Sequence, residues 1–374
     1  MVYLDNSATT RPCSEAVQAA QRALTEVWGN PSSIHRSGIA AHTELEEARA
    51  AVAAAMGAEK KCIYFTSGGT EADNWAIFGA AQKLGRRGKH IITTSFEHHA
   101  VLNPMKKLED QGFDVTYLTP DAHGRITLQA FEAAIRPDTI FASIMMVNNE
   151  LGSVQPIHEM ALCLHRERPE ALFHTDAVQG LFKVPFAART LGADLISVSA
   201  HKVHGCKGAG ALYMKDGVRL PPLLLGGGQE LGFRSGTEPM PAIAAFGAAC
   251  RALLPTAKAD MAAMAALRDT LLERISEVPG AVLLGCGEAP HIVSLSIPGL
   301  RSQVIINDLQ DEGVYVSAGS ACSRGHRSHV LTAAHADARA IDGAIRVSFS
   351  RENTPEDVDA LIAALQKTAH RLRR

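Results

Sequence analysis

The chain has 374 residues, a formal net charge of −2 and an apolar content of 46%. This length is sufficient for two domains with a substantial core, and the composition is that of a globular protein. The near-balance of charge gives no indication of nucleic acid or an anionic membrane as a partner. The longest apolar runs, such as "IFASIMMV", are far shorter than the ~20 residues that span a bilayer.

The first residues and the cysteines indicate where such a protein works. The start "MVYLDNSATT" lacks the basic and then apolar pattern of a secretory signal, so we expect a cytoplasmic protein. Seven cysteines are scattered without a CxxC pair, which is too few and too irregular for a disulfide framework. Most of them are expected to pack as small apolar residues, and we expect no metal site.

From about residue 12 to about residue 254, strand-like runs alternate with helix-like stretches. "KCIYFTSGGTEADNWAIFGAAQKL" reads as a strand, a glycine-rich turn and a helix, and "KHIITTSFEHHAVLNPMKKLEDQG" repeats the plan. "TIFASIMMVNNELG" and "ALFHTDAVQG" add two further strands, each followed by a loop. This alternation predicts an α/β domain over 15–254, with a mostly parallel sheet and ligands outside the carboxyl ends of its strands.

The pattern changes after the long helix predicted in "LLPTAKADMAAMAALRDTLLERI". Short strands follow in "HIVSLSI", "VYVSA" and "AIRVSFS", and a closing helix begins with Pro355 just inside its start. We therefore predict a smaller α+β domain formed by 1–14 and 255–374.

The first predicted strand end carries "TSGGTEAD". Gly68 and Gly69 form a turn, and Thr70 with Asp73 has the spacing of a capping box for the next helix. Free backbone N–H groups at that helix start, together with the Thr70 hydroxyl, are suited to bind a phosphate. Glycine turns before helices are common, so this motif alone is weak.

The next three strand ends carry a histidine, an amide and an acid. His98 lies in "SFEHHAVL", Asn149 in "VNNELG", and Asp176 with Gln179 in "HTDAVQ". Each residue has a structural alternative: a histidine is more often a hydrogen-bonding residue than a catalyst, and asparagine or aspartate after a strand often caps a helix.

A lysine ends the following strand. In "DLISVSAHKVHGCKGAGALYM" the apolar run 195–198 stops just before Lys202, and glycines at 205, 208 and 210 allow the backbone to approach closely. A strand end that dips into water would explain a lysine. The alternative is an amine held in a cleft for chemistry.

Considered together, these strand ends favour one cofactor. Pyridoxal phosphate needs a lysine for its Schiff base, an acid against its ring nitrogen and a dipole-rich phosphate site. The acid keeps the ring protonated, so that the ring accepts electrons from the substrate's Cα. All of these groups fall where this architecture places its ligand site.

The same residues resemble the motif series of the cysteine desulfurases, pyridoxal-phosphate enzymes of the class V aminotransferase group. Nine segments match in order, from about residue 3 to about residue 350: "YLDNSATT", "GNPSSIHRSG", "FTSGGTEADNWAI", "EHHAVL", "VNNELG", "TDAVQ", "SAHKVHGCKGAGALY", "RSGTEP" and "SAGSAC". The resemblance implies pyridoxal-phosphate-transferase fold type I and a homodimer.

The resemblance also implies a role for each matched residue. Lys202 would hold the cofactor covalently, Asp176 would face the ring nitrogen, and Gln179 the phenolic oxygen. His98 would stack on the ring and transfer protons. The phosphate would be bound by Gly69, Thr70, Ser199 and His201, and by Thr237 of the neighbouring subunit. Asn149 and Arg346 would bind the substrate carboxylate; strand alternation in "AIRVSFS" places Arg346 opposite the apolar face of that strand.

Cys322 differs from the other cysteines. It lies in "VSAGSACSRGHRSHVL", a stretch of small residues that we expect to be mobile, and Arg324, His326 and His329 nearby favour a thiolate. A small spacer in a loop is the structural alternative. Next to a pyridoxal site and within "GSAC", we interpret Cys322 as the nucleophile.

The predicted activity is a cysteine desulfurase, a transferase that converts L-cysteine to L-alanine and moves the sulfur to Cys322 as a persulfide. The family suggests sulfur-acceptor proteins such as iron–sulfur scaffolds or tRNA-thiolation relays. Two alternatives remain at this point. An aminotransferase or another lyase on this fold would not need Cys322, and a non-catalytic assembly partner would not need Lys202 or Asp176.

Several positions depart from the family pattern. His204 and Cys206 replace a tyrosine-like residue and a proline, and Leu231 and Phe233 replace frequent arginines. The segment between Cys322 and Ser328 is also shorter by a couple of residues. None of these changes removes a residue assigned to the chemistry, but the shorter segment bears on the reach of Cys322 and on the choice of acceptor.

Overall fold

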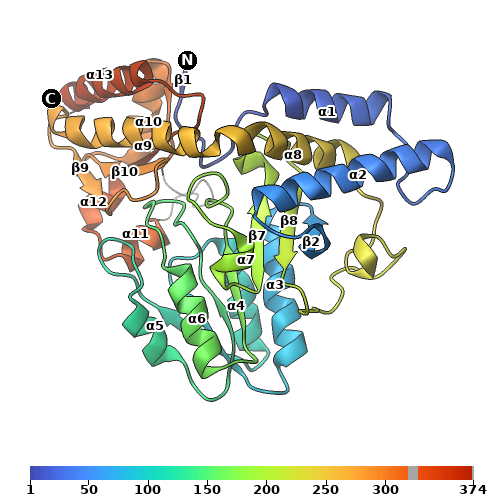
Figure 1. The fold of residues 1–374 in the computed structure, drawn as a ribbon. Helices are drawn as coiled ribbons and strands as arrows, with labels where there is room; N and C mark the ends of the chain where they lie inside the picture. Colours follow the sequence, from blue (N-terminus) through green and yellow to red (C-terminus); the bar gives the residue numbers. More distant parts are fainter. Residues whose placement is uncertain (319–326, 373–374) are drawn as a thin grey trace.

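A mostly parallel sheet forms the centre of the larger part of the computed structural model, which describes residues 1–318 and 327–372 (Figure 1). Within these residues the sheet has seven strands, in the spatial order β2 (Ile63–Thr66), β8 (Gly210–Met214), β7 (Leu195–Ser199), β6 (Leu172–Asp176), β5 (Thr139–Ser143), β3 (His90–Thr94) and β4 (Asp114–Leu118). Strand β8 is antiparallel to both neighbours, and the other neighbouring pairs are parallel. The predicted α/β architecture is confirmed.

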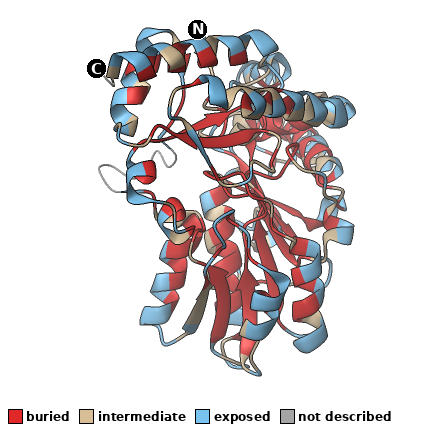
Figure 2. Ribbon diagram, turned by 90° about the vertical axis from the view of Figure 1, so that its left-hand side faces the viewer, coloured by how far each residue is buried: buried red, intermediate tan, exposed pale blue. Residues whose placement is uncertain are grey.

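Helices cover both faces of this sheet, and its central strands are therefore buried on both sides (Figure 2). On one face, α3 (Gly69–Leu84) and α4 (His99–Asp110) form a core that includes Leu195 of β7. On the other face, Ile196 enters a core shared with α2 (Arg36–Ala55), α6 (Ile157–Glu167) and α8 (Met240–Leu253). The remaining helices of this part are α1 (Ser14–Thr25), α5 (Leu128–Ala134) and α7 (Ala188–Leu191).

A long helical stretch connects the two parts of the molecule. Helix α8 is followed by a 3-10 turn at Leu254–Thr256 and then by α9 (Ala257–Arg274); in Figure 1 they run end to end across the top. Pro255 lacks the N–H that would continue the first helix. Among the described residues, Met240–Glu277 has the length and apolar composition of a membrane span, which the sequence pattern did not lead us to expect, yet 56% of its most apolar window is buried in the fold. This is the behaviour of a core helix.

The smaller part contains the strands predicted near the C-terminus. Strands β12 (Ala344–Ser348), β10 (Ile292–Ser296) and β9 (Val282–Leu284) form an antiparallel sheet, and β1 (Val2–Tyr3) pairs with β11 (Val314–Tyr315). Their core is closed by α9, α10 (Ser302–Asp311) and α13 (Pro355–Leu372). Two short helices, α11 (His329–Ala333) and α12 (Ala338–Asp342), complete this part.

The predicted domain boundary at residues 254 and 255 stays a prediction. Leu4 packs in the smaller core with residues from 264 to 369, as a domain built from both ends of the chain requires. However, Leu284, Ile292 and Val330 belong to the larger core, so the two parts share a wide apolar contact.

Candidate active site

A cavity of about 260 Å³ lies at the carboxyl ends of β2, β3, β5, β6 and β7, where the sequence pattern predicts a site. Ten of the twelve predicted site residues line it: Gly69, Thr70, His98, Asn149, Asp176, Gln179, Ser199, His201, Lys202 and Arg346. Arg346 comes from β12 of the smaller part, so the cavity lies between the two parts. The roles of these residues stay predictions, but their convergence is a property of the fold.

Lys202 ends a 3-10 turn that follows β7 directly. Its Nζ donates hydrogen bonds to the backbone carbonyls of Ser7, at 2.5 Å, and Ala8, at 2.9 Å. Both residues also line the cavity. The N-terminal segment therefore holds the amine at the cavity wall, which a lysine at a solvated strand end would not require.

Asp176, the last residue of β6, is buried, and this burial raises the pKa of its carboxyl to about 6. The amine of Lys202 opposes the shift, and the backbone N–H of Val178 donates to Asp176 Oδ1 at 2.8 Å. Behind it lies Asp73, whose pKa is raised well above its usual range by burial and by the charge of Asp176. Burial and the neighbouring charge therefore oppose ionisation of Asp73 more than that of Asp176.

His98 is the N-cap of α4, and its Nδ1 accepts a hydrogen bond from the backbone N–H of Ala100 at 3.1 Å. The proton of the neutral imidazole is therefore on Nε2. Burial and the charge of Lys202 lower the pKa of His98 to about 4. At neutral pH the ring is therefore uncharged.

The proposed phosphate site combines the first turn of α3 with residues after β7. The helix begins at Gly69 with Gly68 as its N-cap, so the predicted capping box of Thr70 and Asp73 is wrong: Thr70 lies in the first turn and lines the cavity. A Cβ on Gly69 would lie 2.6 Å from Val178 Cγ2. The absence of a side chain at Gly69 thus allows the backbone of α3 to lie close to the Val178 side chain at the cavity.

His201 completes this group from the other side. Its Nδ1 lies 3.2 Å from Thr9 Oγ1, and burial and Lys202 lower its pKa to about 4. Ser199 lies two residues before it, at the end of β7. Helix N–H groups, hydroxyls and a neutral imidazole therefore converge, and this set of donors fits a phosphate.

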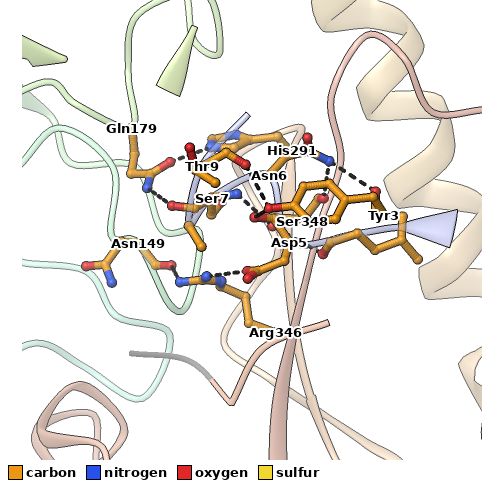
Figure 3. Close-up of polar contacts among 12 residues, drawn as sticks. Tyr3, Asp5, Asn6, Ser7, Thr9, Asn149, Gln179, His291, Arg346 and Ser348 are labelled. Carbon is orange, nitrogen blue, oxygen red and sulfur yellow. Dashed lines mark hydrogen bonds and ion pairs between the residues drawn. The ribbon is translucent and has the colours of Figure 1, made fainter. Parts of the chain in front are cut away.

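Arg346 is held by two partners from different parts of the chain (Figure 3). Its Nη1 donates to the backbone carbonyl of Asn149 at 2.9 Å, and its Nη2 pairs with Asp5 at 2.8 Å. Nε is buried and has no hydrogen-bond partner within the described part of the chain. A buried, oriented guanidinium with an unsatisfied donor is suited to bind a carboxylate.

Two predicted residues lie elsewhere. Thr237 is exposed and does not line the cavity; it belongs to the segment 221–239. That segment is anchored by Glu230, which receives two hydrogen bonds of 2.7 Å from Arg49 of α2. Cys322 lies in 319–326, outside the described residues.

The cavity also contains residues that were not assigned from the sequence. His99 and His329 lie together at the wall, with ring centroids 4.7 Å apart, and Asp73, Ser7 and Ala8 also line it. The stretch "YLDNSATT" was the available signal for Ser7 and Ala8. Nothing local could show that this stretch contacts Lys202, almost two hundred positions later.

Comparisons with known proteins show what the chain is similar to. The family model described as aminotransferase class-V matches residues 2–361. Cysteine desulfurase IscS of Methanosarcina thermophila is 42% identical, over 100% of this chain and 93% of the relative. Cysteine desulfurase IscS of Dictyoglomus turgidum is 40% identical, over 100% of this chain and 95% of the relative.

Two solved structures have a similar fold over nearly the whole chain. A NifS-like protein superposes with a TM-score of 0.92 at 38% identity, covering 100% of this chain and 99% of the other. A protein described as SspA in complex with cysteine has a TM-score of 0.82 at 34% identity, covering 95% of this chain and 100% of the other.

Proposed function

The chain belongs to the class-V aminotransferase family, and from that premise we propose how its residues carry out the desulfuration of cysteine. It is a pyridoxal-phosphate-dependent cysteine desulfurase that converts L-cysteine to L-alanine. The observation that carries the residue assignments is the convergence of Lys202, Asp176 and a phosphate site on one cavity.

The residues present fit this cofactor. When bound, it supplies an aldehyde that joins an amine and an electron-withdrawing ring that takes up the electrons released at the substrate's Cα. Lys202 would hold the cofactor through Nζ, and the first turn of α3 with Ser199 and His201 would bind the phosphate. Asp176 would bind the ring nitrogen, where a cationic partner would favour the ionised carboxylate.

Proton movements fall to Lys202 and His98. The free amine of Lys202 would take the Cα proton of the substrate, and the carbonyls of Ser7 and Ala8 would accept hydrogen bonds from the resulting ammonium group. His98, neutral with its proton on Nε2, would pack beside the cofactor and could give that proton to the departing product. Both groups are half-buried at the wall of the cavity.

Arg346 fixes the substrate by its carboxylate. Asp5 and the Asn149 carbonyl already hold the guanidinium in one orientation, so little conformational freedom is lost on binding. Its Nε, buried and without a partner among the described residues, is the donor that we assign to the substrate carboxylate. The Asn149 side chain at the cavity wall provides the second contact.

The sulfur leaves the substrate by attack of the Cys322 thiolate. A bond forms between Cys322 Sγ and the substrate sulfur as the bond from that sulfur to Cβ breaks. The electron pair of the broken bond stays with the three-carbon fragment, which is protonated and released as alanine. Cys322 then carries a persulfide, which passes to an acceptor protein such as an iron–sulfur scaffold. We place this reaction in the cytoplasm, in accord with the absence of disulfides among the six described cysteines.

The enzyme acts as a homodimer in this proposal. Large apolar side chains are exposed in two neighbouring segments: Trp28 and Ile34 between α1 and α2, at 72% and 95%, and Leu225 and Leu231 in 221–239, at 87% and 78%. Both segments line one groove on the surface. Such a patch is typical of an interface, and it would bring Thr237 to the partner's phosphate site.

Alanine and sulfide formation from L-cysteine and a thiol tests the sulfur step. Cys322→Ser should reduce alanine formation by more than about a hundredfold, because no other group is assigned to accept the sulfur. Cys286→Ser, at an exposed free cysteine, should retain wild-type turnover. Intact mass should show one additional sulfur atom on the peptide that contains Cys322. Full turnover by Cys322→Ser would instead favour an aminotransferase or another lyase.

A further inference from the structure

The Gln179 side chain has both ends of its amide engaged, and one of its partners comes from the smaller part of the molecule (Figure 3). Nε2 donates to the backbone carbonyl of Ser7 at 2.9 Å, and Oε1 lies 3.3 Å from Nε2 of His291. A carbonyl can only accept a hydrogen bond, so the amide nitrogen must face Ser7 and the oxygen must face His291. His291 is therefore the donor in this pair.

Among the described residues, the His291 side chain makes no other hydrogen bond. It is buried, it lies next to β10, and its Nδ1 has no hydrogen-bond partner there. Burial and the charges of Lys183, Arg346 and Lys202 lower the pKa of His291 well below its usual value, so the ring carries one proton. That proton is on Nε2, directed at Gln179.

The amide nitrogen of Gln179 lies beside the reactive lysine. The Ser7 carbonyl accepts from both Gln179 Nε2 and Lys202 Nζ, so the two nitrogens share one acceptor. On pyridoxal phosphate, the ring oxygen is the acceptor next to the carbon that joins the lysine. The second N–H of Gln179 would thus be available to that oxygen, whereas a rotated amide would present its own oxygen and repel it.

We propose that His291 is a positioning residue for the cofactor: by donating to Gln179 Oε1, it keeps the amide nitrogen directed at the ring oxygen. This rests on the proposed function of the cavity. Without His291, the amide oxygen would be buried without a donor, a loss that favours rotation of the amide toward other partners.

The test is the pH dependence of the visible absorbance of the substrate-free holoenzyme. A donor at the ring oxygen stabilises its deprotonated form, so its loss should raise the midpoint of the absorbance transition by roughly one pH unit. His291→Phe and His291→Leu should both show this shift, together with weaker cofactor binding by equilibrium titration. His291→Gln, which retains an N–H donor, should stay close to wild type. Either donor-lacking variant is sufficient if the other does not fold.

Two further variants distinguish a loss of cofactor positioning from a general loss of stability. Gln179→Leu should shift the midpoint as His291→Phe does, and the double variant should shift no further, since both changes remove the same hydrogen bond. His90→Leu is the matched control: His90 is buried at the start of β3 and bonded to Thr139 and Thr116, away from the cavity. Its loss should lower stability without moving the midpoint.

An unchanged midpoint in His291→Phe, with a shifted one in Gln179→Leu, would overturn the proposal and leave the function of the cavity intact. Additive shifts in the double variant would also overturn it. A wild-type protein that shows no cofactor absorbance would instead refute the proposed function itself.

Discussion

At the scale of single residues, two histidines of the cavity are uncharged at neutral pH. His98 and His201 both have pKa values lowered to about 4, by burial first and by the charge of Lys202 second. At neutral pH both imidazoles are uncharged. Neither of them therefore forms an ion pair with Asp176 or with a phosphate in place of Lys202. The local electrostatics thus separate the binding groups from the reacting amine.

Gly69 offers a test of the phosphate site at this scale. Gly69→Ala places a Cβ 2.6 Å from Val178 Cγ2. This contact should push Val178 into the cavity, where the cofactor is proposed to bind, and lower cofactor affinity by about tenfold. Gly68→Ala is the matched control, because its Cβ would meet nothing nearer than 4.0 Å and its φ of 160° is extended. Equal affinities of the two variants in a fluorescence titration would contradict this assignment.

At the scale of secondary-structure elements, local sequence patterns predicted strands and the turns after them. They did not predict contacts between residues that lie far apart in the sequence. Apolar runs and the turns after them located five of the seven described strands of this sheet, and with them His98, Asp176 and Lys202. The capping box at Thr70 was a wrong prediction because Thr70 is the second residue of the helix and the N-cap is Gly68, two positions earlier. The bond from Arg346 to Asp5 joins residues more than three hundred positions apart, and no periodicity records such a contact.

The contact between the turn after β6 and α9 contains a buried amine that the mechanism does not use. Lys183 is 5% exposed, and its Nζ lies 3.9 Å from the Met264 sulfur. Burial lowers its pKa from 10.5 to about 8, against the opposing charge of Asp260. The unfolded chain therefore binds more protons than the fold between these pH values, and Lys183 destabilises the protein most below pH 8.

We expect Lys183→Met to raise the free energy of unfolding at pH 7 by at most about 3 kcal/mol, since one pKa unit corresponds to about 1.4 kcal/mol. The gain should shrink as the pH rises from about 8 toward 10.5, where the wild-type amine becomes neutral in both states. Lys107→Met, at an exposed lysine of α4, is the control and should change little. Urea unfolding at several pH values measures this, and a gain that is constant with pH would contradict the burial of a charged amine as its cause.

At the scale of the whole molecule, the single chain lacks one part of the predicted site. The cavity contains ten of its residues, whereas Thr237 is exposed on a segment anchored to α2 through Arg49 and Glu230. Removing one partner of this buried pair should cost about 3–5 kcal/mol. A firmly anchored segment with an exposed threonine and apolar neighbours is suited to contact a second subunit.

Mixing two inactive variants tests this arrangement. Lys202→Ala has no reactive amine, and Thr237→Asp should repel the phosphate of its partner. After subunit exchange, half of the dimers are mixed, and each contains one site with both residues intact, so about a quarter of wild-type activity should return. No recovery, despite mixed dimers seen by native mass spectrometry, would mean that Thr237 acts within its own chain or not at all.

The most direct test of the proposed mechanism is the covalent bond at Lys202. The holoenzyme is reduced with borohydride, digested, and the pyridoxyl group located by peptide mass spectrometry. We predict one pyridoxyl group per chain, on the Lys202 side chain, and none on Lys183 or Lys207. A pyridoxyl group on another lysine, or on none, would contradict the mechanism.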